Sequence, residues 1–332
     1  MITAEMQTIS INRPLHMFSV EQFHKDGFDI IALKDDLNDI QVEIIPAHSA
    51  MLHAFRIPHG TEELNIIDGY SNLQDYQANK AEYFKGAKLS PFACRIPGGR
   101  YEWEGKEYII EKAITPGSCI HGLLYDVAFD IVELHANERS AIAVLRYQYK
   151  GEDKGYPFPY DCEVTYRLQP DIRLEISTTI SNHAATAIPL MDGWHPYFTT
   201  GTPIDDMELQ FASEQIVEFN AQLIPTGRVL PYDRFLESSP LEGIPLDNSF
   251  LLNFGQHASS CTLRDPLKHI AITFYPDSSY PVLQLYIPPH RRSIAIENLT
   301  GPPNAFNNGM GLISLPAGES RTFSTGISAA AW

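Results

Sequence analysis

The chain has 332 residues, of which 44% are hydrophobic and 20% are charged, so it contains enough apolar material for a buried core. Its 24 Lys and Arg residues against 41 Asp and Glu residues give a net charge of −17, a field that repels phosphate backbones and anionic lipids. The composition argues against binding to nucleic acid or to a membrane surface and weakly favours a neutral ligand, although acidity that serves solubility alone would explain the charge equally well.

Cysteine usage and hydropathy indicate the compartment. The four cysteines are far apart, form no CxxC pair and lack the spacing of metal ligands, so we expect reduced thiols (Cys94, Cys119, Cys162 and Cys261). Residues 1–20 lack the basic start and apolar core of a signal peptide, and no apolar run approaches the ~18 residues of a membrane span. We expect a cytoplasmic enzyme or binding protein that is a monomer or a homodimer.

Alternation of apolar and polar residues with a period of two dominates the chain. In Cys162–Gln169, for example, Cys162 and every second residue after it face one side. This pattern predicts strands that are buried on one face, as in antiparallel sheets. In chain order the predicted strands are Gln41–Ile45, Ala141–Tyr149, Cys162–Gln169, Arg173–Ile180, Ser249–Phe254, Ile270–Tyr275, Val282–Ile287 and Ser293–Glu297. One short helix is predicted over Asn72–Phe84.

Turn residues separate these strands. The 24 prolines and 21 glycines gather in clusters such as Pro97-Gly98-Gly99 and Pro116-Gly117. Many short strands with little helical periodicity predict a large all-β protein whose sheets pack face to face as a sandwich. One large domain and two halves that share a core both fit the length. Because no repeat or convincing linker divides the chain, we expect a single domain over residues 1–332.

Most common catalytic motifs are missing. The sequence has no G-x-S-x-G elbow, no P-loop or dinucleotide glycine pattern and no H-E-x-x-H, and no cysteine has an obvious His partner. Covalent catalysis, phosphoryl transfer and zinc hydrolysis are therefore disfavoured. Acid–base chemistry by histidine and carboxylate remains.

Three segments could carry such chemistry. His195 lies in Met191–Phe198 (M-D-G-W-H-P-Y-F), where aromatic rings and a proline could hold its imidazole at the mouth of a cleft. His121 directly precedes Gly122, a residue that permits close approach of a ligand. Glu297 is on the face of its strand opposite the apolar residues, at a predicted strand end beneath a loop. Taken alone, each could also be a packed or solvated residue.

Further polar residues could orient a polyhydroxylated ligand. Gln284 and Tyr286 lie on the non-apolar face of Val282–Ile287, and Asp247 directly precedes a predicted strand. Arg95 stands in P-F-A-C-R-I-P-G-G-R-Y. Each of these could also be an ordinary surface or turn residue.

Taken in order, these segments resemble the aldose 1-epimerase (galactose mutarotase) family. The matching segments are P-F-A-C-R-I-P-G-G-R-Y-E-W-E-G-K-E-Y (91–108), H-G (121–122), H-P-Y-F (195–198), P-L-D-N-S-F-L-L-N (245–253), L-Q-L-Y (283–286), the strand of Glu297 and L-P-A-G-E-S (315–320). The resemblance extends over roughly residues 28–328. It implies a large antiparallel β-supersandwich with a sugar in an open cleft on one sheet.

The resemblance also implies roles for individual residues. Glu297 resembles the general base that takes the proton of the anomeric hydroxyl, and His195 resembles the general acid that protonates the ring oxygen. His121 resembles a residue that binds the sugar and polarises the ring oxygen, with Trp194 and Tyr197 beside His195 fixing its imidazole or lining the sugar. The remaining sugar-binding positions are Arg95, Asp247 and Gln284. Such a reaction needs no metal or other cofactor.

Departures from the family pattern concern the substrate. Well-known members often have Asn before the arginine, Gly-Gly after the first histidine and H-S-Y-F at the second, where this chain has Cys94, Gly122-Leu123 and H-P-Y-F. An alternative substrate is a hexose 6-phosphate, whose phosphate could meet Arg95 and Lys88. A non-catalytic sugar-binding protein is a second alternative. A glycoside lyase or hydrolase is a third, and it would use Asp247 as a second carboxylate.

Overall fold

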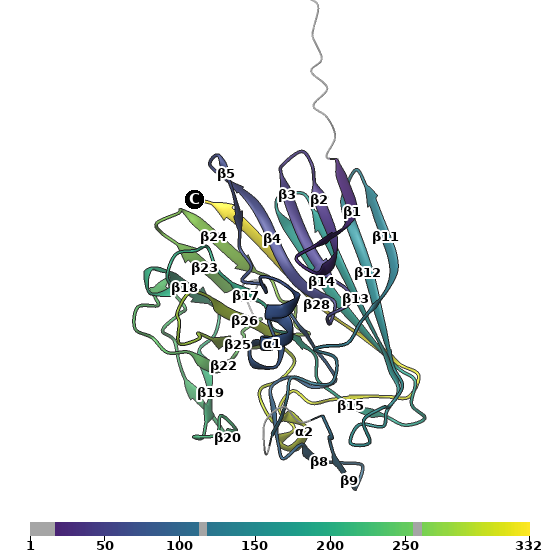
Figure 1. Ribbon diagram of the computed structural model, residues 1–332. Coiled ribbons are helices and arrows are strands. Elements are labelled where there is room, and N and C mark those ends of the chain that lie inside the picture. Colours follow the sequence, from purple (N-terminus) through teal and green to yellow (C-terminus); the bar gives the residue numbers. More distant parts are fainter. Residues whose placement is uncertain (1–16, 113–117, 255–260) are drawn as a thin grey trace, which may run out of the picture.

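The protein, seen in a computed structural model, is described over residues 17–112, 118–254 and 261–332. Antiparallel strands dominate these ranges (Figure 1), so the all-β prediction is confirmed. Their helices are α1 (Leu73–Tyr83), α2 (Ala305–Asn308) and the 3-10 turn η1 (Ile204–Asp206). Within these ranges no helix is long and apolar enough to cross a bilayer. The predicted turn at Pro116-Gly117 and most of the N-terminal segment tested for a leader lie outside them.

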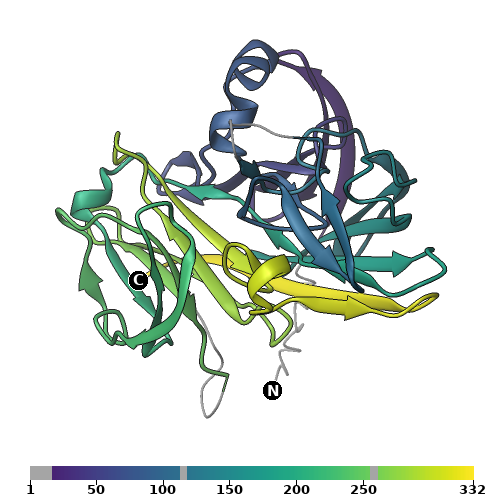
Figure 2. The same cartoon turned by 90° about the horizontal axis from the view of Figure 1, so that it is seen from below.

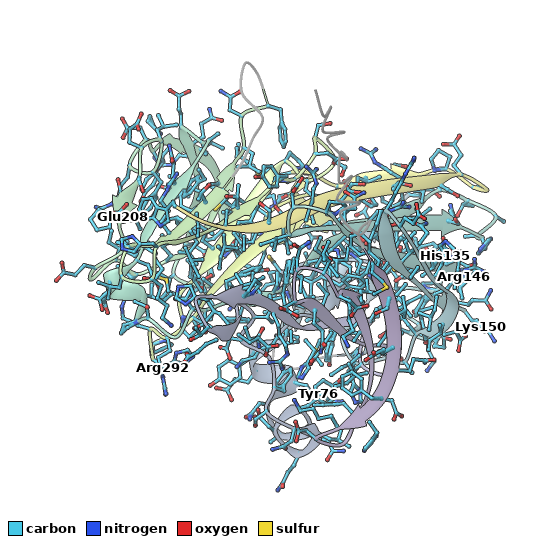
Figure 3. All side chains as sticks on the ribbon, turned by 90° about the horizontal axis from the view of Figure 1, so that it is seen from above. Tyr76, His135, Arg146, Lys150, Glu208 and Arg292 are labelled. Carbon is cyan, nitrogen blue, oxygen red and sulfur yellow. The ribbon has the colours of Figure 1, made fainter. Side chains whose placement is uncertain are left out.

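A nine-stranded sheet forms one layer. Its spatial order is β11 (Asp130–Asn137), β12 (Ser140–Tyr149), β13 (Tyr160–Gln169), β14 (Arg173–Asn182), β28 (Ser320–Ala331), β24 (Ile270–Phe274), β23 (Cys261–Asp265), β18 (Glu208–Phe211) and β21 (Ser239–Pro240). The long strand β28 joins the two halves of this sheet, as its yellow ribbon shows in Figure 2. Figure 3 shows His135 of β11 and Glu208 of β18 on opposite sides of the molecule. In β13, burial alternates strictly, as the sequence predicts.

An eight-stranded sheet packs against one half of the first sheet and carries the site described below. Its strands are β20 (Pro225–Pro231), β19 (Gln215–Phe219), β22 (Asp247–Leu251), β25 (Val282–Tyr286), β26 (Ile294–Leu299), β16 (Gly193–Trp194) and β6 (Lys88–Leu89), with β17 (Tyr197–Phe198) also paired to β26. Phe198 packs on Phe274 of β24, with ring centroids 4.6 Å apart, and Phe250 packs on Phe211 of β18 at 4.8 Å. These contacts form the face-to-face sandwich that the strand pattern predicts.

A five-stranded sheet covers the other half. Its order is β1 (Phe18–Lys25), β2 (Phe28–Asp35), β3 (Ile40–Ile45), β4 (Met51–His59) and β5 (Glu62–Asn65). Strand β2 packs on β12 and β13, and the Tyr166 hydroxyl of β13 donates to the Ala50 carbonyl at 2.7 Å. Two-stranded ribbons complete the fold: β7 (Arg95–Pro97) with β10 (Ser118–Ile120), β8 (Arg100–Trp103) with β9 (Lys106–Ile109), and β15 (Ile188–Leu190) with β27 (Ile313–Leu315).

Helix α1 connects the five-stranded sheet to the site. Asn72 caps its N-terminus by accepting from the Asp75 N–H at 2.9 Å, and the helix ends at Phe84, whose φ of 52° is left-handed. Its buried residue Tyr76 packs on Phe28 of β2 and is labelled beside this sheet in Figure 3. The predicted helix is thus confirmed to within a residue at each end, and its C-terminal end brings Phe84 toward the eight-stranded sheet.

Candidate active site

One cleft on the eight-stranded sheet brings together the six residues to which the family resemblance assigns proton transfer or sugar binding. Glu297, His195 and His121 line it together with Arg95, Asp247 and Gln284, and it encloses about 640 Å³ including space open to solvent. This is a usual size for a small-molecule site. The residues come from positions as far apart in the chain as 95 and 297, and no linear segment contains more than one of them.

Strand register fixes one wall of the cleft. Gln284 of β25 lies directly opposite Glu297 of β26, and Asp247 of β22 lies opposite Tyr286 of β25. Neighbouring side chains on one face of an antiparallel sheet project side by side, so Glu297 and Gln284 lie next to each other, and Tyr286, two residues after Gln284, extends this polar patch. The Gln284 amide donates to Asp247 at 3.0 Å and accepts from Ser249 at 2.5 Å, which fixes its orientation.

The backbone holds His195 beside Glu297. The strands before and after it, β16 and β17, both pair with β26, at Leu299 and at Ala295. The His195 amide donates to the Ala87 carbonyl at 3.1 Å, and its own carbonyl accepts from Gly86 at 2.9 Å. Tyr197 stacks on the imidazole, with centroids 5.1 Å apart and an interplanar angle of 24°. The imidazole is therefore fixed by pairing on both sides and by a ring on one face.

Glu297 and His195 form a buried acid–base pair. Glu297 Oε1 lies 3.4 Å from His195 Nε2, and the two residues are only 2% and 5% exposed. Desolvation, reinforced by the charge of Asp247 and opposed by Arg95, raises the pKa of Glu297 well above its ordinary value. Desolvation also lowers the pKa of His195 to about 3. Both shifts favour a protonated carboxyl next to a neutral imidazole, rather than an ion pair, in the protein without a ligand.

His121 presents a neutral donor to the cleft. The Cys94 N–H donates to His121 Nδ1 at 3.3 Å, so the neutral ring carries its proton on Nε2. Burial, the neighbouring His195 and Arg95 lower the pKa of His121 well below its ordinary value, which keeps the ring neutral. Gly122 has a φ of +80°, and a Cβ there would lie 2.3 Å from the Ser90 carbonyl oxygen. The His-Gly pair in the sequence therefore marks a backbone turn that only glycine fits.

The same tautomer bears on metal binding. Ligating atoms of His121, His195 and Glu297 lie within 4.8 Å of one another, which is close enough to suggest a metal centre. Zinc would need a lone pair on His121 Nε2, whereas the Cys94 N–H at Nδ1 places a proton there. The geometry favours hydrogen bonding to a ligand over coordination of a metal.

Several lining residues had no signal in the sequence. Glu82 and Phe84 come from the end of α1, and Phe219, Ile120 and Pro303 complete the cleft. Phe84 lies against the His121 ring, with centroids 4.6 Å apart, because its left-handed backbone turns the chain at that point. A left-handed C-cap is recognisable in sequence only when it is glycine or asparagine. The turn that brings Phe84 into the cleft could therefore not be identified from the sequence.

Three expectations need correction. Glu297 is not at a strand end, because β26 continues to Leu299. Lys88 does not reach the cleft: it is fully buried and paired with Asp192. Trp194 packs beneath the sheet over Lys88 rather than on the imidazole or a ligand, since its side chain follows the alternation of β16 to the opposite face.

Comparisons with known proteins bear on the family and on the fold. The family model of aldose 1-epimerase matches residues 29–328. The uncharacterized protein YihR of Escherichia coli is 27% identical, over 70% of this chain and 75% of its own length. The galactose mutarotase of Pongo abelii is 29% identical over 67% of this chain, and the match spans 64% of that protein, slightly under two thirds. A crystal structure of a galactose mutarotase-like protein from Clostridium acetobutylicum superposes with a TM-score of 0.84 at 16% identity, covering 95% of this chain and 99% of that one.

The burial of Glu297 predicts a pH-dependent gain in stability for Glu297→Gln. Because the folded-state pKa is raised, folding disfavours the ionised form, and the associated stability is lost as the pH rises from the unfolded pKa of about 4.3 through the folded pKa. The variant cannot ionise, so its Tm should be close to that of the parent near pH 4, below the unfolded pKa, and exceed it near pH 8. Thermal melts at the two pH values measure this difference. Glu242→Gln, at an exposed position, is the matched control and should show no such trend. A Tm difference for Glu297→Gln that shrinks with rising pH would contradict the assigned protonation state.

Proposed function

The chain belongs to the aldose 1-epimerase family, and we propose that it interconverts the α and β anomers of a free hexose or related aldose in the cleft of the eight-stranded sheet. The observation that carries the proposal is the 3.4 Å contact between Glu297 and His195, two buried groups that can exchange a proton. The galactose mutarotase among its relatives supports a hexose as the substrate.

Anomer exchange needs two proton transfers at once. Opening the ring of a cyclic hemiacetal removes the proton of the C1 hydroxyl and adds one to the ring oxygen. In the proposed reaction Glu297 accepts the first proton and His195 donates the second, which yields the open-chain aldehyde. After rotation about C1–C2, the ring oxygen attacks the other face of the aldehyde and both protons return. Atoms and charge balance without a cofactor.

The acid–base pair therefore holds one exchangeable proton, in addition to the ring proton that a neutral imidazole keeps. When the cyclic sugar is ready to open, the proton is on His195 and Glu297 is ionised; when the aldehyde is present, the proton is on Glu297 and the imidazole is neutral. Burial favours this second state. Sugar hydroxyls that donate to the carboxylate favour the first, because hydrogen bonds stabilise the charged form. A carboxyl group whose pKa is raised toward neutrality suits such a two-way transfer.

The other cleft residues would bind and orient the sugar. His121 offers its Nε2–H to the ring oxygen or a neighbouring hydroxyl, which would stabilise the charge that develops there. Arg95, Asp247 and Gln284 provide donors and acceptors along the opposite edge, with the Gln284–Asp247 bond at 3.0 Å holding both in place. Tyr286 and Phe219 supply flat surfaces that suit the apolar faces of a sugar ring.

The charges in the cleft favour a free aldose over a sugar phosphate. Glu82, Asp247 and Glu297 line the cleft together with Arg95, its one lining cation among the described residues. Lys88, the second cation that a phosphate would need, is buried beneath the sheet with Asp192. A phosphate dianion would therefore meet net repulsion.

Glu297→Gln is expected to lower kcat for anomer exchange by about 10²–10⁴-fold, because the amide cannot accept the C1 proton. KM should change less, since the amide keeps the size of the side chain. The rate can be measured by exchange NMR of the anomeric protons or by polarimetry on a fresh anomer. Glu242→Gln, the exposed control, should match the parent. Parent-like exchange in Glu297→Gln would reject Glu297 as the base, and tight sugar binding by the parent without exchange would favour the non-catalytic alternative.

Asp247→Asn should move the high-pH (basic) limb of the pH profile of kcat/KM. The negative charge of Asp247 helps to raise the pKa of Glu297, so Asp247→Asn should lower that pKa. The single proton is then lost from the pair at lower pH, and the basic limb of kcat/KM, which reports the free enzyme, should move in the same direction. The absolute rate will also fall, because Asp247 faces the sugar, but the position of the limb is independent of that loss. A limb that stays in place or moves upward would contradict the assigned coupling.

Phosphorylated substrates should be discriminated against. We expect kcat/KM for a free hexose to exceed that for its 6-phosphate by roughly 10-fold or more, since each tenfold requires only about 1.4 kcal/mol of repulsion. Glu82→Gln removes one carboxylate that lines the cleft. It should raise kcat/KM for the hexose 6-phosphate and so reduce the preference for the free hexose. Parallel exchange assays on both sugars with both proteins test this, and a preference for the phosphate would favour the hexose-6-phosphate alternative.

A further inference from the structure

A fully buried ion pair lies next to the strands that carry the proposed acid–base pair. Lys88 Nζ is 2.5 Å from Asp192 Oδ1, and neither side chain is exposed to solvent. The Tyr280 hydroxyl donates to the same oxygen at 2.6 Å, and Lys88 also donates to the Gly193 carbonyl at 2.9 Å. The ammonium lies over the Trp194 ring, 4.6 Å from its centroid. Asp192 had no role in the sequence analysis, although it stands in the same motif as His195.

This ion pair ties together the segments that hold the two reacting groups. Asp192 exchanges two hydrogen bonds with Thr300, three residues after Glu297 on the strand β26 and its continuation: its N–H donates to Thr300 Oγ1 at 3.1 Å, and its carbonyl accepts from the Thr300 N–H at 3.0 Å. Lys88 lies opposite Trp194, the residue before His195, in the pairing of β6 with β16. A displacement of either charged side chain would therefore move the backbone on one side of the His195–Glu297 contact.

Backbone contacts also connect the strand of Lys88 to the segment that holds His121. Ser90, two residues after Lys88, forms a parallel bridge with Gly122, and its carbonyl accepts from the Leu123 N–H at 2.7 Å. The Lys88 N–H donates to the Ser49 hydroxyl at 2.9 Å, which anchors β6 from its other side. His195, Glu297 and His121 thus depend on backbone segments that meet around Lys88 and Asp192.

Stability alone does not account for two buried charges. Removing both ions from water is costly, and a buried ion pair can commonly be replaced by apolar side chains of similar size with no loss of stability. Removing one partner is damaging, because the other charge is then buried alone. An ion pair differs from an apolar contact in its directionality: its hydrogen bonds to Tyr280 and Gly193 specify one arrangement of the strands.

We propose that Lys88 and Asp192 are positioning residues that hold His195 at proton-transfer distance from Glu297 without touching the sugar. The inference rests on the proposed function. We expect this pair to control kcat rather than binding, because the sugar-binding residues Arg95, Asp247 and Gln284 lie on other strands, β7, β22 and β25. Proton transfer depends steeply on the separation and alignment of donor and acceptor, so a shift of a few tenths of an ångström is enough to slow it.

The central experiment replaces both charges together. The double variant Lys88→Met/Asp192→Leu is expected to keep the fold and the parent's Tm or a higher one, to bind sugar with a Kd within about threefold of the parent, and to lose 10-fold or more in kcat. Calorimetry gives Kd and exchange NMR gives kcat. A folded double variant whose kcat is within twofold of the parent overturns the inference, as does a variant that loses binding and turnover in equal measure.

Tyr280→Phe provides a test if the double variant does not fold. It removes one hydrogen bond from Asp192 and keeps the ring in place, so we expect kcat to fall by about threefold with KM unchanged. Tyr101→Phe is the matched control: Tyr101 is equally buried and its hydroxyl donates to the Gly155 carbonyl at 2.7 Å, but it does not line the cleft. Its kcat should equal that of the parent. Equal kcat values for the two variants would overturn the inference.

A readout independent of turnover separates this inference from the proposed function. The ¹⁵N resonances of the His195 imidazole report its hydrogen bonding and protonation, and the double variant should shift them while leaving those of an exposed histidine such as His24 in place. If the parent shows no anomer exchange, the proposed function fails, but a shift of the His195 signals still supports positioning. Unchanged His195 signals in the folded double variant overturn it.

Discussion

The desolvation of Glu297 beside His195 is the constraint on which the rest of the site depends. Ionisation of a carboxyl group that is only 2% exposed costs free energy, because the charge is removed from water. The same holds for protonation of the buried imidazole 3.4 Å away. In the proposed reaction the two groups share one exchangeable proton, and the polar groups of the bound sugar decide which of them holds it. In this account the fold supplies burial and fixed geometry, and the sugar supplies the hydrogen bonds that move the proton from the carboxyl to the imidazole.

Antiparallel pairing turns that constraint into geometry. Because β26 pairs with β25 on one side and with β16 and β17 on the other, Glu297 has Gln284 next to it on one strand and His195 between the other two. Backbone conformations that are costly for ordinary side chains gather around the cleft: φ is 52° at Phe84, 55° at Cys94, 60° at His121 and 62° at Asn304. Such strain persists only where the surrounding structure over-determines it, and here it aims Phe84 and His121 into one space. The buried pair of Lys88 and Asp192 lies where these segments meet.

The sequence predicted the parts of the fold whose physics is local. Strands with one buried face, such as β13, are recognisable by their alternation, and the short helix predicted over Asn72–Phe84 is found as α1. The strand β2 was missed because most of its residues are buried, so no alternation appears. One face packs on β12 and β13, and on the other face Phe28 packs against Tyr76 of α1. At the site, the residues of a recognisable family pattern could be named in advance, whereas Phe84 and Glu82 could not, because they reach the cleft through the end of a helix. Lys88 looked like a surface cation for a phosphate, and only the tertiary structure reveals its burial with Asp192.

The central claim is that His195 and Glu297 carry one proton between them and that a bound sugar relocates it. Infrared difference spectroscopy of the parent against Glu297→Gln, with and without a saturating aldose near neutral pH, observes the carboxyl group of Glu297 directly. We expect a protonated carboxyl band in the protein without sugar. This band should weaken when the aldose binds, while the ¹⁵N signals of His195 move toward the imidazolium form. A carboxylate band of full intensity before sugar is added, or a protonation state that the sugar leaves unchanged, would contradict it.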